Sequence, residues 1–244
     1  MRDLTCMSYW LAKLEAAGLP VPRTTLVPMP REAFRDVFRL FDGKELEGPG
    51  HEFLEKLDSA AAAIGYPVFL RTGQTSGKHS WARTCYVTDP NRLLSHVASL
   101  VEFSECVSLI GLPCDWWAVR DLLPTMPLAL CHSYEGMPVC REFRCFVEDG
   151  DVRCMHPYWP AEALERGGVA DPESLAQRLS ECADEEQVRE LAARAGAAVG
   201  GAWSVDVLET ERGWFVTDMA EAQKSWHWPG CPNEVGKRPH PKFI

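Results

Sequence analysis

Two pairs of alternating apolar and polar segments, each pair joined by a turn, constrain this chain more than any other sequence feature. The first pair joins residues 139–147 to 152–158 through Glu148-Asp149-Gly150-Asp151, and the second joins 203–208 to 214–219 through Thr210-Glu211-Arg212-Gly213. Side chains alternate between the two faces of a strand, so both pairs are predicted to be antiparallel hairpins. Helical patterns precede and separate them, which predicts an α+β fold in two lobes with a hinge near residues 122–124.

The remaining segments complete this outline. Helices are predicted around residues 10–17, 53–64 and 90–101 and after the capping residues Asp171 and Asp184; strands are predicted at 67–71, 81–87 and 116–119. Residues 31–41 mix basic and apolar side chains and are assigned to neither class. The division expected is a leading segment at 1–50, a small lobe at 51–122 and a larger lobe at 123–244.

Charge and composition exclude several classes of function. The formal net charge is −10 and no Lys/Arg run is present, which argues against a nucleic-acid partner. No apolar stretch approaches the ~18 residues of a membrane helix, and the N-terminus lacks a signal-peptide pattern, so we expect a cytoplasmic protein without a membrane partner. Ten single cysteines, with no CxxC pair, are predicted to be buried free thiols; Cys85, Cys106, Cys140 and Cys145 lie among apolar neighbours. His227 and Cys231 come nearest to metal-site spacing, but as a lone pair they do not predict a metal centre.

The Gly-rich segment from Arg71 to Lys78 is the first candidate site. It joins two predicted antiparallel strands, so its backbone N–H groups could surround phosphate oxygens while the two basic residues supply positive charge. Its spacing is not that of a P-loop. The alternative is a flexible hairpin tip with solvated basic side chains.

Glu142 and Arg144 form the second candidate. They are two residues apart in a predicted strand and therefore share one face. They could form a surface ion pair worth under ~1 kcal/mol, or they could line a cleft.

The C-terminal hairpin supplies the third candidate. If it turns about Arg212, with Gly213 in a left-handed conformation, Asp206 and Asp218 lie opposite one another. Such a pair is destabilising unless a cation or a shared proton neutralises it. Mg²⁺ is the expected cation, and Glu221 could complete its ligands. In the alternative register, shifted by one residue, the two aspartates face opposite sides.

These candidates, taken in order along the chain, resemble ATP-grasp proteins. The resemblance rests on the segments Ala17–Thr24, Ile64–Arg71, Val119–Pro124, Glu142–Val147, Ser204–Asp206 and Val216–Asp218. The string EFRCFV is particularly similar to the cell-division-cycle-123 type, and residues 218–225 look more like the small bacterial and phage R2K clade. The family usually closes with Glu-x-Asn, whereas this chain has Asp218-Met219-Ala220, which leaves the second magnesium open unless Glu221 replaces the missing ligand.

The resemblance implies an ATP-grasp fold in which two α+β lobes grip ATP between antiparallel sheets. It places Arg71, Lys78 and Glu142 at the nucleotide, with Arg144 and Lys78 as catalytic residues on the transferred phosphate. It also places adenine on the linker formed by Arg120, Asp121, Leu122 and Leu123, and the metal on Asp206 and Asp218.

The implied activity is an ATP- and Mg²⁺-dependent carboxylate–amine ligase that forms an amide through an acylphosphate, with a small acid and an amine or peptide as substrates. The alternatives are an ATP-binding assembly factor that grips a protein partner and a kinase on the same fold. Trp226, His227 and Trp228 either shape an acceptor pocket, with His227 as a general base, or simply pack in the core. Because the chain is short ahead of the lobes, we expect at most a fragment of a separate substrate-binding domain.

Overall fold

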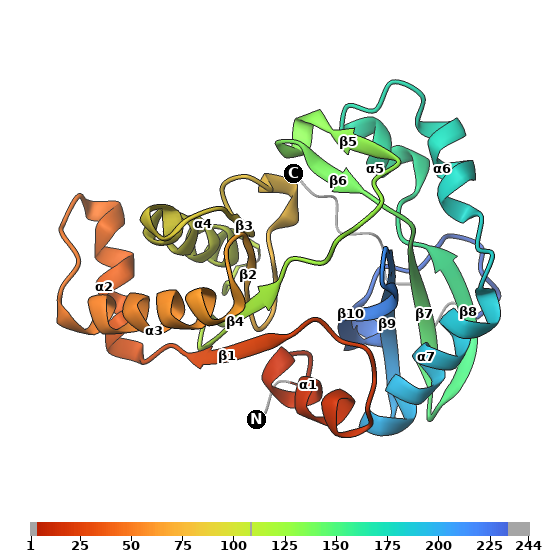
Figure 1. The fold of residues 1–244 in the computed structure, drawn as a ribbon, viewed down its shortest axis with the longest axis horizontal. Coiled ribbons are helices and arrows are strands. Elements are labelled where there is room, and N and C mark those ends of the chain that lie inside the picture. Colours follow the sequence, from red (N-terminus) through yellow and green to blue (C-terminus); the bar gives the residue numbers. More distant parts are fainter. Residues whose placement is uncertain (1–3, 108, 234–244) are drawn as a thin grey trace.

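The computed structural model describes residues 4–107 and 109–233. Its described strands form two four-stranded antiparallel sheets and one two-stranded sheet (Figure 1). Each large sheet is the centre of one lobe, and helices cover one face of it. The predicted two-lobed α+β arrangement is therefore what the chain adopts.

The first lobe is built on the sheet with strand order β1-β4-β2-β3. Its elements are β1 (Thr24–Pro28), α2 (Arg31–Arg39), η1 (Leu40–Asp42), α3 (Gly48–Ile64), β2 (Val68–Thr72), η2 (Lys78–Ser80), β3 (Tyr86–Val87), η3 (Pro90–Arg92), α4 (Leu93–Cys106) and β4 (Trp116–Asp121). Apolar residues of the three α-helices pack on the sheet; Phe53 of α3, for example, meets Trp117 of β4 edge to face at 5.6 Å. The C-terminal end of β4 points toward the second lobe, and the chain continues from it into that lobe (Figure 1).

The second lobe is built on the sheet with strand order β10-β9-β7-β8. Its elements are α1 (Met7–Ala16), β7 (Glu142–Glu148), β8 (Asp151–Pro157), α7 (Glu185–Val199), β9 (Ala202–Thr210), β10 (Gly213–Glu221) and η5 (Ala222–Lys224). Helices α1 and α7 bury their apolar stripes against one face, which carries Phe143, Cys145, Val205 and Val207. Because side chains alternate, the neighbouring residues Glu142, Arg144 and Asp206 project from the uncovered face.

A smaller cluster extends the second lobe at the upper right of Figure 1. It consists of β5 (Ala129–Cys131), η4 (His132–Tyr134), β6 (Met137–Val139), α5 (Ala161–Arg166) and α6 (Pro172–Ser180). Its core is separate from the two main cores and centres on Met137, Trp159 and Leu164.

Several predicted boundaries change in the structure. Residues 31–39 form α2, and the buried Asp36 of this helix accepts hydrogen bonds from the N–H groups of Glu47 and Gly50 at the start of α3. The strand predicted at 81–87 contracts to β3, so the loop after β2 is longer than expected. The strand predicted from Val139 divides into β6 and β7, and β5 and α5 were not predicted.

The N-terminal 50 residues are shared between the lobes. Helix α1 packs in the core of the second lobe, whereas β1 pairs with β4 in the first. The domain boundaries drawn from the sequence remain a prediction.

All ten cysteines lie within the described residues and are free thiols, as predicted. The expected burial holds for seven of them. Cys182 and Cys231 are half-buried, and Cys106, at the end of α4, is exposed, because the apolar stripe of this helix does not include it. None of the described helices has the length and apolar character needed to cross a membrane.

Candidate functional site

Asp206 of β9 and Asp218 of β10 are directly opposite one another, but the turn that achieves this differs from the predicted one. Thr210 pairs with Gly213 across a two-residue turn, a register that would set Thr217 against Asp206. A bulge between Val216 and Asp218 adds one residue to β10 and brings Asp218 opposite Asp206. The predicted juxtaposition is therefore correct, and the bulge at Thr217 produces it.

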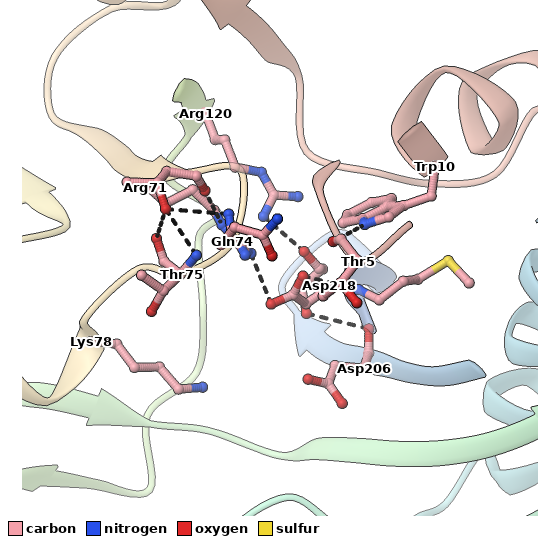
Figure 2. A network of polar contacts seen from close by, with 12 residues as sticks. Thr5, Trp10, Arg71, Gln74, Thr75, Lys78, Arg120, Asp206 and Asp218 are labelled. Atoms are coloured by element: carbon pink, nitrogen blue, oxygen red, sulfur yellow. Dashed lines mark hydrogen bonds and ion pairs between the residues drawn. The ribbon is translucent and has the colours of Figure 1, made fainter. Parts of the chain in front are cut away.

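Two arginines neutralise these carboxylates, where the sequence suggested a cation or a shared proton. Arg144 of β7 donates from Nε to Oδ1 and from Nη2 to Oδ2 of Asp206, both at 2.8 Å. Arg71, at the end of β2, reaches across from the first lobe, and its Nη1 lies 2.8 Å from Oδ2 of Asp218 (Figure 2). The repulsion expected between the aspartates is thus relieved by guanidinium groups from two different sheets.

Lys78 provides a second contact between the lobes. Its Nζ lies 3.4 Å from Oε2 of Glu142, 3.8 Å from the ring centroid of Tyr158 and 4.9 Å from that of Trp159. The guanidinium of Arg144 lies over the same Tyr158 ring, at 4.7 Å. Tyr158 therefore supports both cations through the negative face of its ring.

The loop that carries Lys78 is held from behind by hydrogen bonds. Thr84 Oγ1 donates to the carbonyl oxygens of Gly77 and Ser80, and the buried His96 of α4 contacts the Thr84 carbonyl through Nδ1 at 2.9 Å. Gly77 has φ = 58°, a left-handed conformation that favours glycine. The loop is consequently anchored at both sides of Lys78, in contrast to the flexible tip that the sequence left open.

Arg120 of β4 donates to a hydroxyl and a carbonyl oxygen, whereas Arg71 and Arg144 pair with carboxylates. Its Nη1 donates to the Thr217 carbonyl at 2.8 Å and its Nε donates to Thr24 Oγ1 at 3.3 Å. Its Nη2 is buried and meets no hydrogen-bond partner among the described residues. A buried donor without a partner is costly, so this guanidinium is suited to receive an acceptor that the chain itself does not supply.

Burial and neighbouring charges shift the ionisation of these groups. Burial is the largest single influence and disfavours the charged forms of Lys78 and Arg144, but the neighbouring groups together outweigh it. Glu142, Tyr158 and Asp206 raise the pKa of Lys78 above its usual value, and the same three residues, Asp206 most of all, raise that of Arg144. Burial raises the pKa of the Glu142 carboxyl, against the effect of Lys78. Burial, and then repulsion by Arg71, lowers the pKa of Arg120 to about 9, which leaves it charged at neutral pH.

Two adjoining cavities open beside these side chains. The larger, about 430 Å³, has mainly apolar walls between the lobes, which include Phe69, Trp81, Tyr86, Leu123, Met137 and Trp159. The smaller, about 260 Å³, is lined by the charged residues Arg71, Lys78, Arg120, Glu142, Asp206 and Asp218 and by the loop residues 74–79. Five residues line both cavities: Phe69, Lys78, Arg120, Glu142 and Thr217. An apolar chamber thus continues into a charged one.

Most of the predicted site residues meet at these cavities. Asp121, Leu122 and Leu123 line the larger one, as the resemblance implies for the linker. Glu221 does not join Asp206 and Asp218, because it lies three residues beyond Asp218 in a strand and therefore on the side of the buried Met219. Its carboxylate accepts from Thr5 at 3.4 Å and pairs with Lys224. Glu221 therefore contacts Thr5 and Lys224 and does not complete the predicted set of metal ligands.

Sequence reasoning missed Tyr158, Trp159 and Thr217. Tyr158 and Trp159 follow β8 in the second lobe and contact Lys78 of the first lobe, which no local spacing reveals. Thr217 is the extra residue of the bulge; its hydroxyl lies 3.4 Å from Glu142 Oε1 and 3.3 Å from the Asp206 carbonyl. The side chain of Arg120 was also missed, because the linker was considered for its backbone.

Comparisons with known proteins identify the family and the fold. A family model described as the ATP-grasp domain, R2K clade family 3, matches residues 60–235. Cdc123 from Schizosaccharomyces pombe has a similar structure, with a TM-score of 0.60 and 14% identity over 90% of this chain and 83% of that one. An ATP-grasp RimK domain protein from Sphaerobacter thermophilus has a TM-score of 0.49 and 17% identity over 89% and 58% of the two chains. No curated protein matches the sequence. The predicted ATP-grasp resemblance and fold are confirmed, and this chain belongs to family 3 of the R2K clade of ATP-grasp domains.

Proposed function

We propose that this protein is an ATP- and Mg²⁺-dependent carboxylate–amine ligase. The observation that carries the proposal is the junction of the two cavities at Arg120. The apolar chamber suits adenine, the charged one suits phosphates, and the buried Nη2 of Arg120 faces no acceptor within the described residues.

The balance of charge supports an anionic ligand. The charged cavity contains Arg71 and Lys78, each paired with a carboxylate, and Arg144 is paired with Asp206 beside it. Arg120 adds a fourth cation without a carboxylate partner in the described part of the chain, so the group has an excess of positive charge. A polyphosphate supplies several strong acceptors for such a set.

Asp206 and Asp218 fit a magnesium site, because Mg²⁺ in such sites takes one or two carboxylates together with phosphate oxygens. Bound magnesium would neutralise charge on the phosphates during transfer. Since Arg144 and Arg71 now hold these two carboxylates, binding requires an exchange of partners. The arginines leave the carboxylates and turn to the phosphates, where they stabilise the charge that develops during transfer.

In the proposed reaction a carboxylate oxygen of the acid substrate attacks the γ-phosphorus, and the bond to the bridging oxygen of ADP breaks. The amine nitrogen then attacks the acyl carbon, loses a proton and expels inorganic phosphate, which leaves an amide. Lys78 and Arg144 hold the transferred group in place, whereas Tyr158 keeps both cations at the junction of the lobes.

The test has a binding step and a turnover step. Calorimetric titration should show that magnesium strengthens ATP binding. Equal affinity for ATP with and without magnesium would refute the assignment of Asp206 and Asp218 as a magnesium site. Purified protein should then release ADP only when an acid and an amine are both present, in a screen of amino acids and short peptides. ADP release with phosphate left on the acceptor would indicate a kinase. Tight ATP binding without turnover, together with a stable protein complex, would favour the assembly factor.

A further inference from the structure

Four side chains outside the nucleotide cavities form a second cluster. Cys154 and His156 of β8 meet His227 and Cys231 of the segment that follows η5, and one ligand atom from each lies within 4.8 Å of the others. In the sequence His227 and Cys231 are a lone pair. The fold supplies the missing pair from a strand more than 70 residues earlier.

The backbone holds the two pairs together. Cys154 and His156 are two residues apart in β8 and project from the same face. Residues 226–233 return to this edge strand and are fastened on both sides of the cluster: Trp228 Nε1 donates to the Pro157 carbonyl at 2.9 Å, and Asn233 Nδ2 donates to the Arg153 carbonyl at 2.8 Å.

The imidazoles are oriented as metal ligands would be. Nδ1 of His227 lies 3.3 Å from the carbonyl of Trp228, which leaves Nε2 directed at Cys154 Sγ, 3.1 Å away. A ligating histidine commonly donates its other ring N–H in this way. Nε2 of His156 is buried and has no hydrogen-bond partner among the described residues.

Aromatic rings pack against the cluster, in which Cys154 is buried and the other three residues are half-buried. Phe146 lies 4.1 Å from His227 between ring centroids, and Trp228 stacks on His156 with an interplanar angle of 14°. These rings cover part of the two imidazoles, and two thiols and two imidazoles face one another. None of the four lines the two cavities of the proposed ligase site.

We propose that Cys154, His156, His227 and Cys231 bind one structural Zn²⁺ ion. Sulfur and imidazole nitrogen are the ligands zinc prefers, and four protein ligands in a closed site are typical of structural rather than catalytic zinc. In a tetrahedral site, the zinc–ligand bond lengths place the ligand atoms roughly 3.3 to 3.8 Å from one another. The four ligand atoms already lie within 4.8 Å of one another, so only small movements would bring them to a zinc ion. Binding releases the two thiol protons and leaves both imidazoles neutral.

Zinc at this position would fasten the C-terminal segment to the exposed edge of the second sheet. It would also fix β8 two residues before Tyr158, which supports Lys78 and Arg144. The ion is therefore expected to stabilise the lobe that carries the aspartates without taking part in phosphate transfer.

The experiment measures metal in the full-length protein, purified under reducing conditions and dialysed against metal-free buffer. Elemental analysis should find about one zinc per chain. After zinc removal, titration with cobalt(II) should give the visible absorption of tetrahedral cobalt and a thiolate charge-transfer band. A folded protein, judged by circular dichroism, that retains no zinc and shows neither cobalt signal would overturn the proposal.

Variants locate the site. Cys231→Ser and His227→Ala should each weaken zinc affinity by more than the roughly 10- to 100-fold that losing a hydrogen-bond partner of a metal ligand costs. Cys182→Ser is the matched control, since Cys182 is also a half-buried thiol but lies outside the cluster. Asp218→Asn should retain zinc, which separates this site from the proposed magnesium site. Equal zinc affinity in Cys231→Ser and Cys182→Ser would refute the assignment.

Discussion

The substitution Asp206→Asn tests whether arginines, rather than a metal, hold the paired aspartates in place. If repulsion between the two carboxylates dominated, removing one charge would stabilise the protein. The structure predicts the opposite, because the side chain of Asp206 is 6% exposed and both of its oxygens accept from Arg144, whose side chain is 19% exposed. The substitution leaves a largely buried guanidinium without its counter-ion.

The size of the effect follows from burial. Removing one partner of a buried ion pair costs about 3–5 kcal/mol, and since the asparagine oxygen can still accept one hydrogen bond we expect about 2–4 kcal/mol. For a chain of this length that corresponds to a fall in Tm of roughly 5 to 15 °C. Asp218→Asn should cost less, about 1–2 kcal/mol: water can reach the Asp218 side chain, which is 38% exposed, and the asparagine oxygen can still accept from Arg71, but the Arg71 guanidinium that loses its counter-ion is only 5% exposed.

The assay is thermal unfolding followed by circular dichroism, in buffer without magnesium or nucleotide. Glu148→Gln is the matched control: it removes a carboxylate from β7 that pairs with Arg153 at 3.0 Å, but both side chains are more than half exposed, so Tm should stay nearly unchanged. A Tm for Asp206→Asn equal to or above that of the unmodified protein would show that the Arg144 pair contributes no stability. Calorimetry on both aspartate variants should then show ATP binding that magnesium no longer strengthens.

Arg144→Ala should lower kcat far more than ATP affinity, whereas Arg71→Ala and Lys78→Ala should weaken ATP binding itself; a full rate for Arg144→Ala at saturating ATP would exclude it from the transferred phosphate. Hydroxylamine in place of the amine should trap the acylphosphate as a hydroxamate in step with ADP release, and ADP release without hydroxamate would argue against an acylphosphate. Burial lowers the pKa of His96, so the imidazole stays neutral in the folded protein at a pH where the unfolded chain is protonated. Stability should therefore be lost as the pH falls below about 6.5, and His96→Gln should reduce that loss in urea unfolding at several pH values, whereas an equal loss in the variant would implicate another group.

The sequence predicted well what depends on local periodicity. Both hairpins, the helix capped by Asp171 and the shared face of Glu142 and Arg144 follow from alternation and capping. Asp184 shows the limit of such patterns: it precedes α7 as predicted, but its side chain makes no capping hydrogen bond and instead accepts from Trp214 Nε1.

Contacts between distant segments could not be predicted in the same way. Tyr158 gives no local signal that it will support Lys78, which comes from the other lobe. The cluster at Cys154 is a similar case, since half of its members precede α7 and half follow β10. Both sets of contacts form because β8 lies at the edge of the second sheet. No single segment of the sequence encodes that strand order.

Thr217 shows how a local irregularity builds the proposed metal site. With the register that the Glu211-Arg212 turn sets, Asp218 would pair with Val205 and face the buried side of the sheet, against α1 and α7. A carboxylate there would lose its hydration without gaining a partner, at a cost of several kcal/mol. The added residue turns Asp218 to the uncovered face, where Arg71 meets it, and directs the carbonyl of Thr217 to Arg120. One bulge therefore places an anion beside Asp206 and also fixes the guanidinium at the junction of the two cavities.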